Sequence, residues 1–156
     1  MRDEEGLVEP VIFADEEIYR QEQTRVFARS WLFVAPEAAI PKNGDYVTTH
    51  MGEDSVIVVR DKNGRIRAFL NKCRHRGNKV CLFDRGNQIA FTCTYHGWTY
   101  ANDGALIGVP AMQDSYLGAL PKDQWGLIEV PRVDTHAGII FACWDEPVMP
   151  LQEHLG

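Results

Sequence analysis

The chain has 156 residues, a formal net charge of −6 at pH 7, and 45% hydrophobic and 24% charged residues. These values are typical of one globular domain with a buried core, and the acidic balance argues against nucleic acid as a partner. The acidic N-terminus lacks the apolar segment of a secretory signal, and no apolar run could span a membrane, so we expect a cytoplasmic protein.

The first 30 residues are predicted to form an arm and a helix. Residues 1–11 are acidic and are expected to be extended or disordered. Asp15 is a typical helix N-cap, because two glutamates follow it in what would be the first turn. The helix is expected to run to about Arg29 and to pack on its own domain. Residues 1–30 are therefore the first of two predicted regions.

From Trp31 onward the pattern changes to short β-rich segments separated by turn residues. Asn63-Gly64 is a strong hairpin signal, and residues 102–104 predict a second turn. The segment 110–124 is loop-like. The expected strands cover residues 31–35, 45–50, 55–60, 65–71, 88–93, 126–133 and 138–144.

This pattern predicts a mostly β, antiparallel domain over residues 31–156, preceded by one N-terminal helix. The final residues, PLQEHLG, end without the features that close a compact domain. We therefore expect the chain to be a fragment of a longer protein.

Two short pairs of candidate metal ligands lie in the middle of the chain. The first is Cys73 and His75 in a C-x-H spacing, and the second is Cys93 and His96 in a C-x-x-H spacing. Each pair is followed by a glycine, Gly77 after one intervening residue and Gly97 directly. Two thiolates and two imidazoles supplied as mixed pairs are the ligand set of a Rieske [2Fe–2S] centre, in which the Cys residues hold one iron and the His residues hold the other.

Other interpretations of the same residues remain open. A Cys2His2 zinc site uses the same atoms, but it usually carries both Cys residues on one arm. The residues could also be buried thiols and hydrogen-bonded imidazoles without a metal. Cys81 and Cys143 fit buried free thiols, and Cys81 is also a weaker ligand candidate because it lies close to Cys73.

The segments CRHRG (73–77) and CTYHGW (93–98), together with residues 12–48 upstream, resemble the Rieske domain of aromatic ring-hydroxylating dioxygenase large (α) subunits. The resemblance covers nearly the whole chain and is most specific in the two loops. It implies a Rieske fold and a [2Fe–2S] cluster held by Cys73, His75, Cys93 and His96.

The resemblance also implies a division of labour. Oxygenation occurs at a mononuclear Fe(II) in a further domain, so no catalytic residue is expected in this chain. Electrons would come from a ferredoxin or reductase, and other α and possibly β subunits would complete the oxygenase. The parent enzyme would use NAD(P)H and O2 to cis-dihydroxylate an aromatic hydrocarbon or aromatic acid.

The remaining histidines do not match the two-His and carboxylate pattern of that mononuclear iron. They are His50, His136 and His154. The nearest cluster, Asp134-Thr135-His136, is predicted to be a turn between strands.

The segment 71–100 carries a net charge of +4 on an acidic chain, which suits an acidic electron donor. Lys72 and Lys79 are the best candidates for docking that partner. Arg74 and Arg76 are explained equally well as structural residues or as part of the docking surface. Trp98 is expected to cover the cluster or to face a partner, and a plain packing role explains it equally well.

The resemblance to Rieske proteins also bears on the reduction potential. High-potential members carry a disulfide and a Ser where this chain has Asn78, Tyr95 and Trp98. Without the Ser hydroxyl, one donor to the bridging sulfide is lost, which predicts a potential in the lower part of the Rieske range of about −150 to +300 mV. Tyr100 keeps one phenol near the loops.

Two other functions compete with the oxygenase domain. The first is a stand-alone Rieske ferredoxin, although a small carrier has little use for the helix before Trp31 and would place its first ligand earlier. The second is a zinc-stabilised binding module with no redox role.

Overall fold

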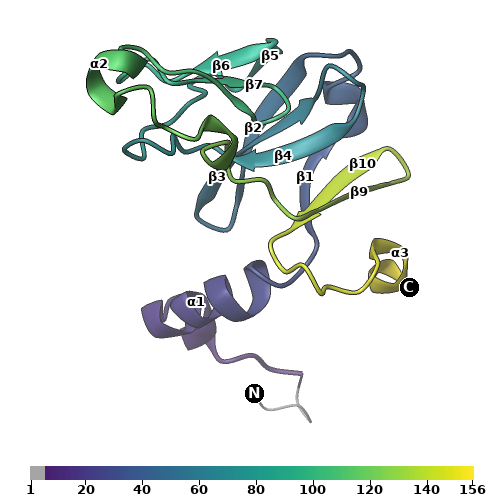
Figure 1. Cartoon of the computed structure of the whole chain (residues 1–156). Coiled ribbons are helices and arrows are strands. Elements are labelled where there is room, and N and C mark those ends of the chain that lie inside the picture. The colour runs from purple at the N-terminus through teal and green to yellow at the C-terminus, as the bar shows by residue number, and fades with distance from the viewer. Residues whose placement is uncertain (1–5) are drawn as a thin grey trace.

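A computed structural model describes residues 6–156 (Figure 1). The arm predicted at 1–11 therefore lies partly outside the described residues. Its described end is a turn at Gly6 followed by a 3-10 helix, Pro10–Phe13.

The predicted N-terminal helix is confirmed. Helix α1 (Glu16–Glu22) continues through a π-helical turn, Gln23–Phe27. The carboxylate of Asp15 accepts the backbone N–H groups of Glu17 at 2.9 Å and Ile18 at 3.0 Å. Asp15 is thus the N-cap, and it satisfies two donors that a helix start leaves without partners.

This helix packs on the domain less than its sequence pattern predicts. Figure 1 shows α1 lying apart from the sheets, and neither α1 nor the π-helical turn contributes a buried residue. Contact is made near the turn between the second and third strands, where the Tyr19 hydroxyl lies 3.2 Å from the Glu53 carboxylate. Of the apolar side chains of α1, Tyr19 is therefore exposed and Ile18 is half-buried.

Ten strands form three sheets in the described residues, and every pairing is antiparallel. The orders are β1-β10-β9, β4-β3-β2-β5 and β6-β7-β8. This confirms the mostly antiparallel β class. The strands are β1 (Leu32–Pro36), β2 (Asp45–Met51), β3 (Asp54–Arg60), β4 (Ile66–Leu70), β5 (Arg85–Asn87), β6 (Ala90–Thr92), β7 (Thr99–Ala101), β8 (Leu106–Gly108), β9 (Arg132–His136) and β10 (Ile139–Cys143).

The middle sheet is buried on both faces. Along β3, Val56 and Val58 point into one core with residues of β1 and β10. The alternate residues, Ile57 and Val59, point into a second core with Phe91 and other residues of the ligand region. Alternation places successive side chains on opposite faces, so this continuous apolar strand lies between two packed layers.

The strand predicted at 126–133 is only partly present, and the turn predicted at Asp134–His136 is wrong because these residues belong to β9. Glu129 forms a single antiparallel bridge with Phe69 of β4, and the N–H of Leu127 donates to the Gly104 carbonyl at 2.8 Å. The regular strand is β9, which begins after Pro131, a residue without a backbone N–H. The actual turn lies at residues 137 and 138, both with positive φ.

Short helices were also missed. Helix α2 (Met112–Tyr116) and a 3-10 helix (Lys122–Gln124) occupy the segment predicted as loop, and α3 (Leu151–Leu155) lies near the C-terminus. Each is five residues or fewer, too short for helical periodicity to register in the sequence.

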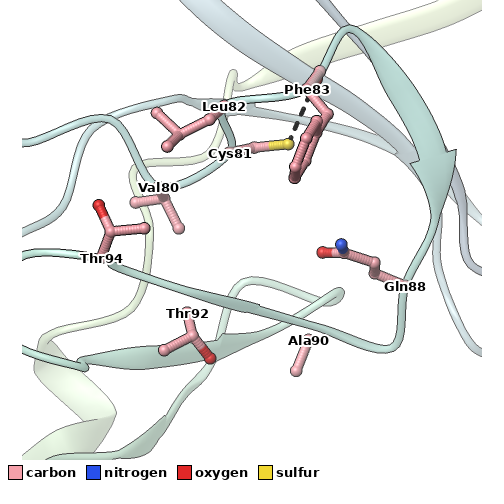
Figure 2. Close-up of a pocket in the computed structure, with 8 residues that line it drawn as sticks. All are labelled: Val80, Cys81, Leu82, Phe83, Gln88, Ala90, Thr92 and Thr94. Carbon is pink, nitrogen blue, oxygen red and sulfur yellow. Dashed lines mark hydrogen bonds between the residues drawn. The ribbon is translucent and has the colours of Figure 1, made fainter.

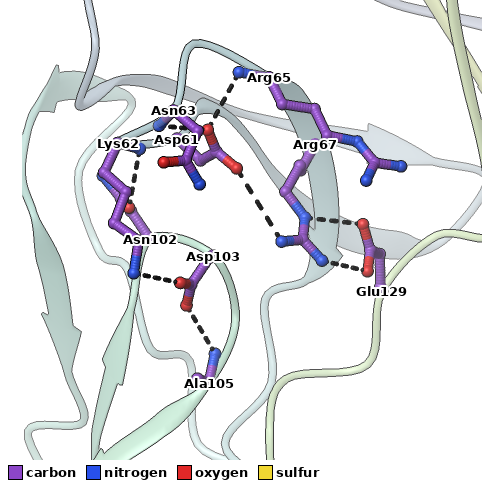
Figure 3. Close-up of polar contacts among 9 residues, drawn as sticks. All are labelled: Asp61, Lys62, Asn63, Arg65, Arg67, Asn102, Asp103, Ala105 and Glu129. Carbon is purple, nitrogen blue, oxygen red and sulfur yellow. Dashed lines mark hydrogen bonds and ion pairs between the residues drawn. The ribbon is translucent and has the colours of Figure 1, made fainter.

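A polar network joins the β3–β4 hairpin to neighbouring segments (Figure 3). The Arg67 guanidinium pairs with Glu129, with an Nε–Oε1 distance of 2.8 Å, and lies 3.9 Å from the buried Asp61. The Lys62 ammonium lies 2.8 Å from Asp103 in the β7–β8 turn, and this bond lowers the pKa of the Asp103 carboxyl. The Lys62–Asp103 pair therefore joins the middle sheet to the ligand-bearing sheet, whereas the Arg67–Glu129 pair joins β4 to the segment before β9.

Candidate metal centre

The first ligand loop, residues 73–78, follows β4 and has a closed backbone. The N–H of Cys73 donates to the Asn78 carbonyl at 2.8 Å, and the N–H of Gly77 donates to the Cys73 carbonyl at 2.9 Å. Gly77 has a φ of +77°, a conformation that costs a side-chain-bearing residue free energy. The glycine after the first ligand pair is therefore required by the turn.

The second ligand loop, residues 93–98, connects β6 to β7 and repeats that backbone. The N–H of Cys93 donates to the Trp98 carbonyl at 2.8 Å, and the N–H of Gly97 donates to the Cys93 carbonyl at 2.9 Å. Gly97 has a φ of +72°. Two loops far apart in sequence thus present their ligands on the same six-residue frame.

The four predicted ligands come together as a pair of thiols and a pair of imidazoles. Cys73 and Cys93 are 3% and 2% exposed, whereas His75 and His96 are half-buried. The two imidazole centroids are 4.6 Å apart, with the rings at 71° to each other. The sulfurs therefore lie in the interior and the imidazoles lie toward the surface.

One buried atom in this arrangement lacks a partner. Within residues 6–156, Nδ1 of His75 is buried and has no hydrogen-bond partner. A buried imidazole nitrogen without a partner is costly unless it binds something. This nitrogen fits a metal ligand, so the residues present suit the group that the sequence predicts.

The protonation states of the metal-free ligands also suit metal binding. Burial lowers the pKa of His75, as do the nearby His96 and Arg76, which favours the neutral imidazole. Burial acts to raise the pKa of Cys93, but hydrogen bonds from the backbone of Tyr95 and His96 and other donors outweigh it. The Cys93 pKa is therefore lowered, toward the thiolate.

Tyr100 contacts the sulfur of the first ligand cysteine. Its hydroxyl lies 3.4 Å from Cys73 Sγ and accepts the backbone N–H of Arg74 at 3.0 Å. Burial raises the pKa of Tyr100, so the phenol keeps its proton. The hydroxyl can therefore donate to Cys73. The sequence predicted only that this phenol lies near the ligand loops.

Trp98 is a packing residue and does not present a docking surface. It is 3% exposed, and its ring stacks on His75 at 5.1 Å between centroids and 7° between planes. Tyr116 and Trp125 cover it edge-on. The prediction that Trp98 covers the ligand region fits this position, whereas its possible role in facing a partner conflicts with its burial.

The basic residues of the first loop divide into two kinds. Arg74 donates to the Gly126 carbonyl at 3.1 Å and lies over the Trp125 ring at 5.6 Å, which is a structural role. Lys72 and Lys79 are exposed and remain available for a partner. Their docking role stays a prediction.

The other two cysteines lie outside the two ligand loops, although Cys81 shares a core cluster with Cys73 and Cys93. Figure 2 shows Cys81 in a surface groove, with its sulfur 3.5 Å from the Phe83 carbonyl. Cys143 is buried in a separate cluster with Trp31 and Leu151. Both are free thiols.

A single zinc ion would need its ligands gathered around one point. Across residues 6–156, no group of three or more His, Cys, Asp or Glu side chains is arranged to hold one metal ion. The pairwise arrangement suits two metal atoms side by side.

None of the helices in the described part is long and apolar enough to cross a membrane.

Comparison with known proteins defines the class. The family model of the Rieske [2Fe-2S] domain matches residues 30–131, so the chain belongs to that family and its cofactor is a [2Fe–2S] cluster.

Within that class, the chain is similar to oxygenase α subunits. It is 50% identical to biphenyl 2,3-dioxygenase subunit alpha of Rhodococcus jostii (strain RHA1), over 97% of this chain and 32% of that protein. It is 46% identical to N,N-dimethyl phenylurea N-demethylase subunit alpha of Sphingobium sp. (strain YBL2), over 98% and 33%. The structure of naphthalene 1,2-dioxygenase from Rhodococcus sp. bound to indole superposes with a TM-score of 0.93 at 43% identity, over 99% and 35%. The chain thus spans about a third of the length of the relatives it matches.

Proposed function

We propose that this chain is the electron-transfer domain of a ring-hydroxylating dioxygenase α subunit. It would accept electrons from a ferredoxin or reductase and deliver them to a mononuclear non-haem iron outside this chain. The observation that carries the proposal is the pair of matching loops, which place two thiols in the interior and two imidazoles toward the surface.

We assign Cys73 and Cys93 to one iron and His75 and His96 to the other. A Rieske centre, when bound, takes up and releases one electron at a time. The chain's own residues then have three tasks. The thiolates anchor the group in a dry interior, Tyr100 donates to one sulfur, and the half-buried imidazoles bring the electron path to the surface.

The reaction of the whole enzyme is proposed from its relatives. Cis-dihydroxylation of an aromatic hydrocarbon or aromatic acid, driven by NAD(P)H, fits the dioxygenases that the chain resembles. A demethylase subunit is similar to this chain at nearly the same level, so similarity in this domain alone does not fix the reaction. The catalytic residues and the substrate pocket would lie in the rest of the protein.

The remaining assignments follow from the same proposal. Residues 1–30 would form the arm and helix and residues 31–156 the Rieske domain, acting in the cytoplasm. Other α and possibly β subunits would complete the assembly. The exposed side chains of Tyr19 in α1 and Val26 in the π-helical turn offer such a neighbour a surface. A stand-alone ferredoxin is not supported, since the similarity to α subunits includes the N-terminal helix.

The test is the visible and EPR spectrum of the anaerobically purified chain, before and after dithionite, with iron, sulfide and zinc counted on the same sample. The proposal expects two irons and two sulfides, a red-brown colour that bleaches, and an EPR signal with average g below the free-electron value. Colourless protein that holds one zinc, and that anaerobic reconstitution with iron and sulfide does not convert, would favour the zinc-stabilised module instead.

The docking prediction has its own test. Lys72→Gln and Lys79→Gln should lower the rate of electron transfer from an acidic ferredoxin several-fold at low salt, and the difference should shrink at high salt. Lys42→Gln, an exposed charge change outside the ligand region, is the matched control. Equal effects at all three positions would contradict a local docking site.

A further inference from the structure

The sixth residue of each ligand loop reaches across to the other loop. Trp98, at the end of the second loop, stacks on His75 of the first. Asn78, at the end of the first loop, places its side-chain amide 3.7 Å from Cys93 Sγ and 3.3 Å from Thr94 Oγ1 of the second. The same amide nitrogen lies 3.1 Å from the Lys79 carbonyl.

We infer that the Asn78 amide donates a hydrogen bond to Cys93 Sγ and thereby raises the reduction potential of the centre. Asn78 is a positioning and tuning residue in this assignment. The inference rests on the proposed function, because it needs Cys93 to be a cluster ligand.

The chemistry of the amide supports this assignment. A side-chain amide has two N–H donors, and Asn78 has three acceptors in reach. The Lys79 carbonyl takes one donor, which leaves the other shared between Thr94 and the sulfur. A metal-bound thiolate carries negative charge and attracts an N–H donor more strongly than a neutral hydroxyl does.

The effect on the potential follows from charge. Reduction adds an electron to the cluster, so a donor at a ligand sulfur stabilises the reduced state more than the oxidised state. Tyr100 supplies such a donor to Cys73, and Asn78 supplies the matching one to Cys93. Each of the two thiolates therefore has one side-chain donor.

Asn78 is the donor that can be changed with the least damage. Tyr100 is fully buried, and its loss would leave a cavity, whereas Asn78 is only half-buried at the edge of its loop. Removing the Asn78 amide should therefore leave a folded, cluster-bearing protein whose potential can be measured.

The experiment is a potentiometric titration of the purified chain, followed by EPR and visible circular dichroism. Asn78→Leu keeps a similar shape and removes the donor. We expect the ratio of reduced to oxidised protein at a fixed potential to fall roughly tenfold, which is about 59 mV for a one-electron couple. The EPR g values should also move, because the donor acts on a ligand atom.

Two variants serve as controls. Thr94→Val removes the competing acceptor and should leave the potential unchanged or slightly higher, since the amide then has only the sulfur in the second loop. Asn43→Leu removes an exposed amide that bonds the Lys62 carbonyl away from the loops, and it should not change the potential.

The outcomes separate the two proposals. A wild-type chain with a Rieske spectrum and an Asn78→Leu variant of unchanged potential would overturn this inference alone. If Thr94→Val lowered the reduction potential as much as Asn78→Leu, the effect would come from the Asn78–Thr94 contact between the loops. That result would also overturn this inference. A wild-type chain without a Rieske spectrum would overturn the proposed function. If Asn78→Leu does not hold the cluster, Asn78→Ala undergoes the same test with the same expected direction.

Discussion

The two ligand loops share a backbone and differ in what they carry on it. His75 is the third residue of its loop and His96 the fourth, so the imidazoles approach from different positions and meet at 71°. Tyr95, which occupies the position of His75 in the second loop, is left 61% exposed. The comparison shows that one frame, used twice with the ligand shifted by one residue, brings two imidazoles together without a clash.

The loops also differ in how they are supported. The first ends in Asn78, a half-buried amide with polar contacts, and the second ends in Trp98, a buried ring packed between aromatic residues. We therefore expect the second loop to contribute more to stability and the first to permit more change. Four predictions test this difference.

The largest effect should come from the thiols, and it should be equal in the two loops. Cys73→Ser and Cys93→Ser should each abolish the iron–sulfur spectrum, because each removes one of the two anchors of the same iron. Iron and sulfide analysis with visible absorption measures this. Cys81→Ser is the control and should retain the spectrum, since its sulfur bonds a carbonyl in the groove of Figure 2.

The sixth residues should differ most in stability. Trp98→Ala should lower the free energy of unfolding by about 3–5 kcal/mol, because it empties a buried aromatic site. Asn78→Ala should cost about 1 kcal/mol, the net value of a typical hydrogen bond. Denaturant unfolding of the cluster-bearing protein measures both. Equal losses would mean that the two loops are supported alike.

Substitution of the loop glycines, Gly77 and Gly97, should again destabilise the second loop more than the first. Both have positive φ, so an alanine at either position should cost about 1–2 kcal/mol. An added Cβ at Gly97 would lie 2.8 Å from the Pro110 ring, whereas at Gly77 it would meet the end of the flexible Lys72 side chain at 3.0 Å. Gly97→Ala should therefore be the more destabilising variant in thermal unfolding, and the reverse order would contradict the comparison.

Substitutions at the second residue of each loop, Arg74 and Thr94, should change stability least. Here the first loop should lose more stability than the second. Arg74→Met loses a bond to the Gly126 carbonyl and the contact with Trp125, and we expect a loss of about 1–2 kcal/mol. Thr94→Val changes an exposed side chain and should stay within about 0.5 kcal/mol. The measurement is denaturant unfolding. A larger loss of unfolding free energy for Thr94→Val than for Arg74→Met would show that the contact of Thr94 with Asn78 stabilises the loop.

Sequence reasoning succeeded where the chemistry is local. The N-cap at Asp15 and the Asn63-Gly64 hairpin depend on residues a few positions apart, and both are present. The spacing of Cys73, His75, Cys93 and His96 predicted a paired site, and the structure brings these residues together. Sequence reasoning missed the five-residue helices, because segments this short show no helical periodicity.

The sequence by itself determined the ligand types, their spacing and the class of fold, because each depends on short-range pattern or on chemistry carried by single residues. Only the tertiary structure decided which neighbours serve the site. It buried Trp98 against His75, set the Cys81 sulfur against the Phe83 carbonyl, and placed the Asn78 amide beside Cys93. These roles depend on contacts between separate loops and strands, and they follow from how the sheets pack rather than from any one segment.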